Sequence, residues 1–278
     1  MLKEGRESTN IEDRRGMSGK GFAIGGGGCF TLILALVVLF LGGDPSSFLR
    51  QAQQDSVQVE QNQPVQSNQQ EDAQKKFVSI VLATTEDSWR ETFRRSGVQY
   101  RDPKLVLFRG QVQSACGAAG SSTGPFYCPA DQKLYLDFAF FDELRNEFKA
   151  PGDFAQAYVI AHEVGHHVQN LLGTMDKVQN LQQRVGEAQS NQLSVRLELQ
   201  ADCYAGVWAN YVKKQGKLEV GDAEEAIRAA AAVGDDMIQK RMQGYVVPES
   251  FTHGSAKERM SWFTKGFQTG DARQCNTF

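Results

Sequence analysis

The chain has 278 residues, a net charge of −3 and 41% hydrophobic residues, so it is long enough for about two domains of ordinary size. The slightly acidic balance argues against nucleic acid as the main partner, because a surface that binds nucleic acid is normally strongly basic. No internal repeat is evident, which argues against repeat architectures.

Residues 21–43 contain no charged residue and are rich in apolar side chains and glycine. The stretch reaches the ~20 residues that a helix needs to span a bilayer. Basic residues up to Lys20 precede it and Asp44 follows it, so the positive-inside rule places the N-terminus in the cytoplasm. We therefore expect residues 1–20 to form a cytoplasmic tail and residues 21–43 to form a transmembrane signal anchor.

A cleaved signal peptide is the alternative interpretation of this segment. The anchor is favoured because the mostly polar residues 1–20 precede the apolar run and because residues 41–47 lack an Ala-x-Ala cleavage site. The expected protein is therefore a single-pass protein of the inner membrane. Its catalytic domain would lie in the periplasm or outside the cell.

Residues 51–76 are dominated by Gln, with Ser, Asn, Asp and Glu, and contain no aromatic residue. Such a composition cannot bury enough apolar surface to order itself, so we expect residues 44–76 to be a flexible linker. The remaining residues, 77–278, are expected to form one α+β domain that is mostly helical with a small β-sheet and is large enough for its own core.

The first expected element of this domain is a helix over residues 78–95, followed by strand-like runs at 105–108 and 133–138. The chain after these strands is expected to be helical. One helix is clearly delimited between Gly152 and Gly173, with apolar residues recurring every three or four positions. This spacing predicts a core helix.

The four histidines fall in two places: His162, His166 and His167 lie close together in this core helix, and His253 lies near the C-terminus. On a helix, His162 and His166 point from one face, and Glu163 directs a carboxylate toward whatever the two imidazoles bind. A His-Glu-x-x-His helix of this kind is typical of zinc hydrolases.

A catalytic zinc takes three protein ligands and leaves its fourth position to water, so a third ligand is needed. The metzincin extension would require Gly and His where this chain has Gln169 and Leu172, which excludes that class. Glu198 and Asp202 are four residues apart, so on a helix Glu198 could bind the metal while Asp202 accepts a hydrogen bond from a ligand imidazole. The alternative is that both acids lie on a solvated helix edge. The need for a third ligand favours one Zn²⁺ per chain, bound by His162, His166 and Glu198.

The other residues in and near these motifs are expected to have different roles. Glu163 is expected to act as general base and acid, taking a proton from the attacking water and giving it to the leaving amine. His167 lies about 100° around the helix from His166, so no metal role is expected for it. Gly165 suggests a close approach of a neighbouring segment. His253, on a loop before a helix, could donate to the oxyanion of the reaction or could be an ordinary surface histidine.

Cys29 lies in the apolar run, so four of the five cysteines belong to the part of the chain that is expected to be exported. An even number of cysteines suits disulfides in an oxidising compartment. Cys116 and Cys128 flank a turn-rich segment and are expected to pair. Cys203 and Cys275 are then left to each other, although a buried free thiol at Cys203 is the alternative.

Six segments of the chain, including the zinc motifs and the cysteine-flanked segment, resemble the bacterial neutral zinc metallopeptidase family. The segments that carry the resemblance are residues 6–15, 113–117, 124–128, 162–167, 198–202 and 275–278. The zinc motifs are also similar to those of the gluzincins, in which the third ligand is a glutamate followed four residues later by an aspartate. The resemblance implies a zincin-like fold and peptidase activity.

Membrane-bound gluzincins carry a Thr-His-Pro segment followed by an arginine. Thr252, His253 and Arg259 are similar to this pattern, with Gly254 in the place of the proline. The resemblance implies that His253 donates a hydrogen bond in the transition state and that Arg259 has a structural or substrate-orienting role.

The leading hypothesis is a membrane-anchored zinc endopeptidase that acts on a peptide or protein substrate. The substrate would lie extended against an edge strand, for which residues 133–138 are one candidate. Two alternatives are kept: a catalytically silent, zinc-stabilised binding protein of the cell envelope, and a zinc amidase that acts on peptidoglycan stem peptides.

Overall fold

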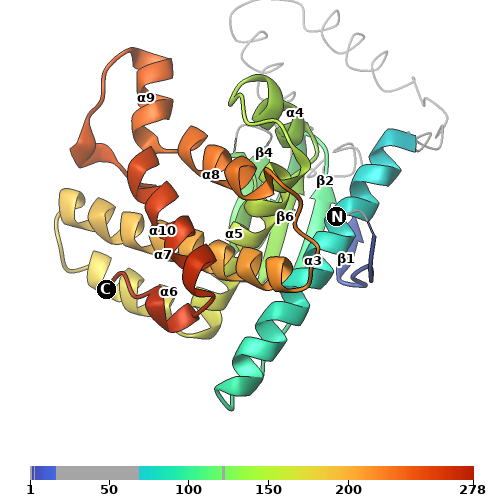
Figure 1. Ribbon diagram of the computed structural model, residues 1–278. Helices are drawn as coiled ribbons and strands as arrows, with labels where there is room; N and C mark the ends of the chain where they lie inside the picture. The colour runs from blue at the N-terminus through green and yellow to red at the C-terminus, as the bar shows by residue number, and fades with distance from the viewer. Residues whose placement is uncertain (1, 3, 17–68, 121–122) are drawn as a thin grey trace, which may run out of the picture. The chain divides into compact units, whose positions relative to one another are not determined.

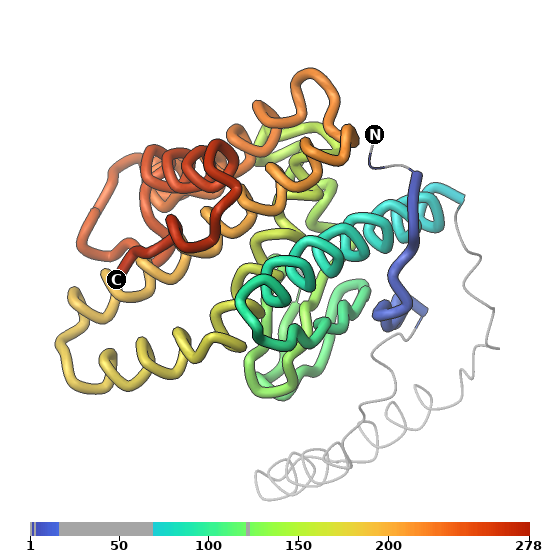
Figure 2. Tube along the Cα trace, turned by 60° about the horizontal axis from the view of Figure 1, so that its bottom comes forward, coloured from blue at the N-terminus to red at the C-terminus, as the bar shows by residue number. Residues whose placement is uncertain are grey.

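The computed structural model describes residues 2, 4–16, 69–120 and 123–278 (Figures 1 and 2). The expected anchor at residues 21–43 lies outside the described residues, as does most of the expected linker. Within the described ranges, no helix combines the length and the apolar character needed to cross a membrane.

The N-terminal segment up to Arg14 belongs to the same folded unit as residues 69–278. Its strand β1 (Ile11–Asp13) pairs in parallel with β2 (Lys104–Phe108). Within the expected cytoplasmic tail, residues 1–20, this segment therefore packs on the domain, because its backbone completes the sheet.

Helix α3 (Gln69–Arg95) begins at Gln69 and not at residue 78 as expected. Residues 69–76, expected to belong to the linker, form its first two turns. Their Gln, Glu, Ala and Lys residues have good intrinsic helix propensity, and acids in the first turn complement the helix dipole. Once the apolar residues that follow are fixed in the core, the helix extends over this polar segment at little cost.

The main sheet has the strand order β1-β2-β6-β5, in which β5 (Phe126–Cys128) is antiparallel to β6 (Lys133–Asp137) and the other pairs are parallel. Strand β6 lies between β2 and β5, and four of its five residues are buried. The predicted strand at 133–138 is thus confirmed, but its candidacy as the edge strand that binds the substrate is wrong. Strand β5 occupies that edge.

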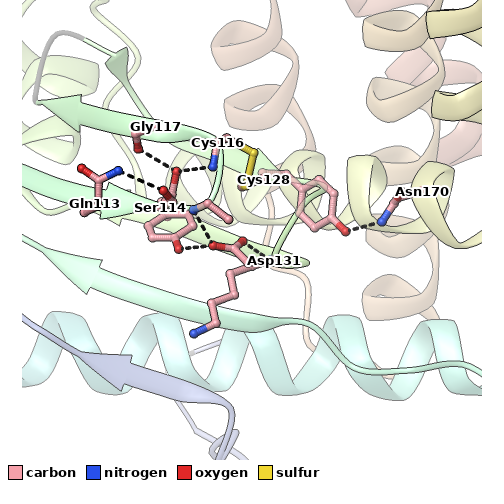
Figure 3. Close-up of a disulfide and its surroundings, with 11 residues drawn as sticks. Gln113, Ser114, Cys116, Gly117, Cys128, Asp131 and Asn170 are labelled. Atoms are coloured by element: carbon pink, nitrogen blue, oxygen red, sulfur yellow. Dashed lines mark hydrogen bonds between the residues drawn. A yellow bond between two sulfur atoms is a disulfide. The ribbon is translucent and has the colours of Figure 1, made fainter.

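A hairpin of β3 (Gln111–Ser114) and β4 (Gly117–Gly120) carries Cys116 in its turn, and the disulfide Cys116–Cys128 joins this turn to the end of β5. Figure 3 shows this disulfide beside the Asp131 carboxylate. Asp131 accepts hydrogen bonds from the Ala115 amide at 3.0 Å and from the Tyr135 hydroxyl at 2.7 Å. The hairpin turn is thus fixed to the edge strand, and the first predicted disulfide is confirmed.

The chain after the sheet is helical, as expected. The helices are α4 (Ala139–Asn146), α5 (Asp153–Leu171), α6 (Thr174–Gln182), α7 (Glu187–Lys214), α8 (Asp222–Ala232), α9 (Asp235–Gln243) and α10 (Ala256–Thr269). Helix α5 contacts α3 and the sheet, and it also packs against α7 and α8 (Figure 1). The disulfide Cys203–Cys275 joins α7 to the C-terminal segment, which confirms the second predicted pair.

Helices α5 and α7 approach each other closely at Gly165. A Cβ atom added there would lie 3.0 Å from both Cα and O of Ala201. Only a residue without a side chain allows this separation without a shift of the neighbouring helix, so the prediction of a close approach at Gly165 is confirmed. The close contact brings the part of α7 around Glu198 up to the motif helix.

Candidate metal centre

Helices α5 and α7 bring together the three residues that are expected from the sequence to bind a metal. His162 Nε2 lies 3.1 Å from one carboxylate oxygen of Glu198, and His166 Nε2 lies 3.3 Å from the other. One candidate ligand atom from each of the three residues lies within 4.8 Å of the other two. The arrangement is a compact donor set on two adjacent helices.

The donor set fits a zinc ion. The Nδ1 atom of His162 lies 2.8 Å from Oδ1 of Asp202, and that of His166 lies 2.9 Å from Oε1 of Gln169. Because both partners are acceptors, each Nδ1 carries a proton, and each Nε2 faces Glu198, on the side where a metal would bind. Two imidazole nitrogens and one carboxylate form the ligand set of catalytic zinc, with the outer nitrogens oriented by hydrogen bonds as here.

Asp202 is completely buried and is held by three side chains. Besides His162, it accepts hydrogen bonds from the Tyr158 hydroxyl at 2.5 Å and from Nε of Arg259 at 2.8 Å. Burial raises the pKa of the Asp202 carboxyl, but the charges of Arg259 and His162 outweigh this and lower the pKa. Asp202 is therefore ionised, and the orientation of the His162 ring is fixed by a fully paired carboxylate.

Arg259, on α10, is only 3% exposed and also donates to the carbonyl of Val233 at 3.2 Å. Its guanidinium group binds Asp202 through two nitrogens, at 2.8 and 3.0 Å. Of the two roles that the resemblance implied, these contacts favour the structural one.

Glu163 lies beside the donor set and lines the same cavity. Its side chain is almost fully buried, and this burial raises the pKa of the carboxyl above its ordinary value. A carboxylate with a raised pKa binds a proton more readily, which suits general-base chemistry.

His253 also lines this cavity, although its side chain is half exposed. Its Nδ1 lies 3.2 Å from Asp235, whose carboxylate also accepts the backbone N–H groups of Thr252, His253 and Gly254 at 2.6 to 2.9 Å. The hydrogen bond to Asp235 raises the pKa of His253. A single carboxylate thus fixes the loop and favours the protonated, donating form of the ring.

His167 points away from the donor set. Its Nε2 donates to the carbonyl oxygen of Arg101 at 2.7 Å, so its Nδ1 accepts a hydrogen bond from the Tyr127 hydroxyl at 3.1 Å. Burial lowers the pKa of His167 and keeps it neutral. The Tyr127 hydroxyl in turn accepts a bond from Asn170 at 2.9 Å, which ties β5 to α5 (Figure 3).

The donor set lies in a cavity of about 600 Å³. Strand β5 and the residues before it form one wall, α5 and α7 contribute the metal ligands, and the His253 loop lies at the rim. Many other lining residues are apolar; they include Phe126, Phe140, Phe148, Met175 and Ile238. The cavity therefore combines a cluster of charged and polar groups around the donor set with apolar surface beside it, which suits a site for a peptide or a small molecule.

Three residues that orient the site were not predicted from the sequence: Tyr158, Gln169 and Asp235. A signal was available for two of them, because Tyr158 is four residues before His162 and Gln169 is three residues after His166 on the same helix face. Asp235 lies at the start of α9, and its partners come from a loop that follows that helix. No local spacing connects it to His253.

A His-Glu-x-x-His helix, a glutamate from a second helix and a buried carboxylate behind the first histidine define a site of the zinc metallopeptidase class. The whole chain, residues 1–278, matches the family model described as "Putative neutral zinc metallopeptidase", and the chain belongs to this family.

Two relatives are similar over much of the chain. "Uncharacterized protein YpfJ" of Escherichia coli (strain K12) is 50% identical over 281 residues, which cover 98% of this chain and 96% of the relative. "Uncharacterized protein Rv2575" of Mycobacterium tuberculosis (strain H37Rv) is 46% identical over 214 residues, which cover 73% of this chain and 71% of the relative. No significant match was found among solved structures.

Proposed function

We propose that this protein is a zinc endopeptidase in which His162, His166 and Glu198 hold the metal. The observation that carries this proposal is the convergence of two imidazole nitrogens and one carboxylate within a cavity of about 600 Å³. A zinc ion held there would supply Lewis acid chemistry, polarising a substrate carbonyl and lowering the pKa of a water molecule to about 7.

Glu163 takes the proton from the water that attacks the scissile carbonyl carbon. As the carbon–nitrogen bond breaks, the Glu163 carboxyl gives this proton to the leaving amine. Burial supports both steps, because it raises the pKa of Glu163 and brings its proton affinity closer to that of the groups with which it exchanges protons.

His253 donates a hydrogen bond to the oxyanion that develops on the attacked carbonyl. Its contact with Asp235, which favours the protonated ring, and its position in the lining of the cavity that holds the metal ligands support this role. Asp202 and Arg259 do not need to touch the substrate; they hold His162 in the ligating orientation.

The substrate lies extended along β5, the edge strand that forms one wall of the cavity. An edge strand can pair with an extended peptide through backbone hydrogen bonds, which give affinity without requiring a particular sequence. Phe126 of β5, with Phe140, Phe148 and Ile238 of the same cavity lining, would accept apolar side chains next to the scissile bond. We therefore expect cleavage next to apolar residues.

We place this reaction outside the cytoplasm, because both disulfides of the described domain belong to an oxidising compartment. The apolar residues 21–43 would attach the domain to the inner membrane.

The test is zinc analysis of the full-length protein, followed by mass spectrometry of a mixed peptide library after incubation. We expect one zinc per chain, cleavage next to apolar residues and loss of cleavage with a chelator. Bound zinc without turnover would support an envelope binding protein, and release of stem peptides from cell-wall fragments in place of library cleavage would support an amidase. A protein that binds no zinc would contradict the proposed metal site, on which the rest of the proposal depends.

A further inference from the structure

The two histidine ligands are oriented by different chemistry. His162 donates to a carboxylate, whereas His166 donates to the side-chain amide oxygen of Gln169 at 2.9 Å. An amide can rotate and present either its oxygen or its NH₂ group, so it orients a histidine only if something fixes the amide itself. Gln169 is completely buried, so solvent does not fix it.

Helix α7 fixes the direction of this amide. The NH₂ group of Gln169 donates to the backbone carbonyl of Leu197 at 2.7 Å and to the amide oxygen of Gln200 at 3.1 Å. A backbone carbonyl can only accept, so the NH₂ end must face α7 and the oxygen must face His166. The proton of His166 is thereby kept on Nδ1.

Gln200 is fixed in the same way by the end of the chain. It is 6% exposed, and its NH₂ group donates to the backbone carbonyl of Cys275 at 2.9 Å. This carbonyl is held in place because the Cys275 side chain is disulfide-bonded to Cys203, 72 residues away in sequence. The amide oxygen of Gln200 is therefore left to accept the bond from Gln169.

We propose that Gln169 and Gln200 are positioning residues that connect the disulfide-bonded Cys275 to the ligand His166 and keep its Nε2 free for the metal. This inference rests on the proposed zinc site. The hydrogen bonds from Cys275 through Gln200 and Gln169 to His166 form a relay. If this relay is interrupted, Gln169 can turn its NH₂ group toward His166. The proton of the ring can then occupy Nε2, where it blocks ligation. Loss of such an outer-shell partner typically weakens metal binding by about 10- to 100-fold.

The experiment measures the zinc affinity of the full-length protein by competition with a chromophoric chelator. We expect Gln169→Leu to weaken zinc binding by about 10- to 100-fold, and Gln200→Leu to weaken it by less because His166 keeps its direct partner. Gln169→Glu, which again offers an oxygen to His166, should bind zinc more tightly than Gln169→Leu. This rescue separates the acceptor role from a role of the side chain in packing.

Asn210→Leu is the matched control. Asn210 is also a nearly buried amide on α7 that donates to a backbone carbonyl, that of Phe267 at 2.7 Å, but it has no contact with the metal ligands. A second readout is the proton NMR signal of the His166 ring N–H in the zinc-loaded protein. Its exchange with solvent should be faster in Gln169→Leu and Gln200→Leu than in Asn210→Leu.

The outcomes separate this proposal from the proposed function. A wild-type protein that binds no zinc contradicts the metal site itself. If wild type binds zinc and both leucine variants match the Asn210→Leu control in affinity and in N–H exchange, the relay is overturned. The double variant Cys203→Ser with Cys275→Ser tests its last step, because zinc affinity equal to wild type would remove the C-terminal segment from the relay.

Discussion

Glu163 and Glu198 are both buried glutamates at the same site, yet their surroundings move their pKa values in opposite directions. Burial raises the pKa of Glu163. Burial also acts on Glu198, but its contacts with His166 and His162 outweigh it and lower the pKa well below the ordinary value. Two carboxylates with opposite shifts suit two different roles, a proton acceptor and a permanently charged ligand.

The first prediction concerns Glu163→Gln. We expect this variant to keep its zinc, because the three ligand residues are unchanged, and to lose peptide cleavage by at least about 100-fold, because general acid–base catalysis contributes roughly 10²- to 10⁴-fold. Zinc content and library cleavage are measured on the same preparation. Glu143→Gln is the control, since Glu143 lines the same cavity and the change in charge is identical. Cleavage by Glu163→Gln at the wild-type rate would remove Glu163 from the mechanism.

The second prediction concerns the pair His253 and Asp235. The pKa of His253 is raised, so its stabilising contribution is present at low pH and is lost as the pH rises through the raised value. The pKa of Asp235 is lowered, so its contribution is lost only when the pH falls through that lowered value. The pair therefore stabilises the loop between these two pKa values.

Replacing Asp235 by Asn keeps an oxygen that can accept the loop amides but removes the charge. NMR titration should then show a lower pKa for His253, and the alkaline limb of the activity profile should move to lower pH. The charges of Glu198 and Arg259 also act on His253, in opposite directions, and stay in place. An unchanged His253 pKa in this variant would show that Asp235 does not control the ring.

At the scale of elements, the contact between α7 and α10 depends on two glycines, one on each helix, each of which lies against the backbone of the other helix. A Cβ atom at Gly206 would lie 2.1 Å from the carbonyl oxygen of Phe263, and one at Gly266 would lie 2.0 Å from that of Cys203. Real Cβ atoms do not approach this closely, so the two helices pack backbone to backbone. This separation also sets how far Arg259 on α10 reaches toward Asp202 on α7.

The third prediction is that Gly206→Ala lowers the free energy of unfolding by about 1–3 kcal/mol, because the added methyl group forces the helices apart. Urea denaturation monitored by circular dichroism gives this value. Gly186→Ala is the control: Gly186 is the N-cap of α7, its φ is −74°, and no atom lies within 4 Å of an added Cβ, so this variant adds a methyl group without a clash and its cost is limited to the weaker N-cap preference of Ala. Equal stability of the two variants would mean that the α7–α10 contact adjusts without cost.

At the scale of the whole molecule, the N-terminal segment completes both the sheet and the environment of a buried acid. Glu86 of α3 is 0% exposed. One of its oxygens accepts hydrogen bonds from Ser8 and Asn10, and the other accepts one from Arg6 at 2.9 Å. Without these residues, a buried carboxylate would lose most of its partners, which is strongly destabilising.

The pairing of β1 with β2 conflicts with the expected single crossing of the membrane. A single crossing of the membrane by residues 21–43 would place the N-terminal segment and the catalytic domain on opposite sides, where β1 could not pair with β2. Residues 4–14 and 69–278 must therefore share one compartment when the described unit is formed.

The fourth prediction is that epitope tags at the two ends of the protein are digested by protease from the same side of the membrane. Intact and permeabilised spheroplasts provide the comparison, with a cytoplasmic protein as the control for leakage. A protected N-terminal tag beside a digested C-terminal tag would show that the tail is cytoplasmic and that β1 is not part of the sheet in the cell.

The sequence by itself determined the helix that carries His162 and His166 and the placement of Glu198 and Asp202 on one face of a second helix. It also predicted the Cys116–Cys128 disulfide and favoured the Cys203–Cys275 disulfide over a free thiol. Helical spacing is a local property, and four cysteines outside the apolar run leave only three possible sets of two pairs. Only the tertiary structure decided that β5 and not β6 is the edge strand, that residues 4–14 join the sheet, and that Cys275 is connected to His166 through two amides. These contacts join segments distant in sequence, and no local pattern encodes which of them meet.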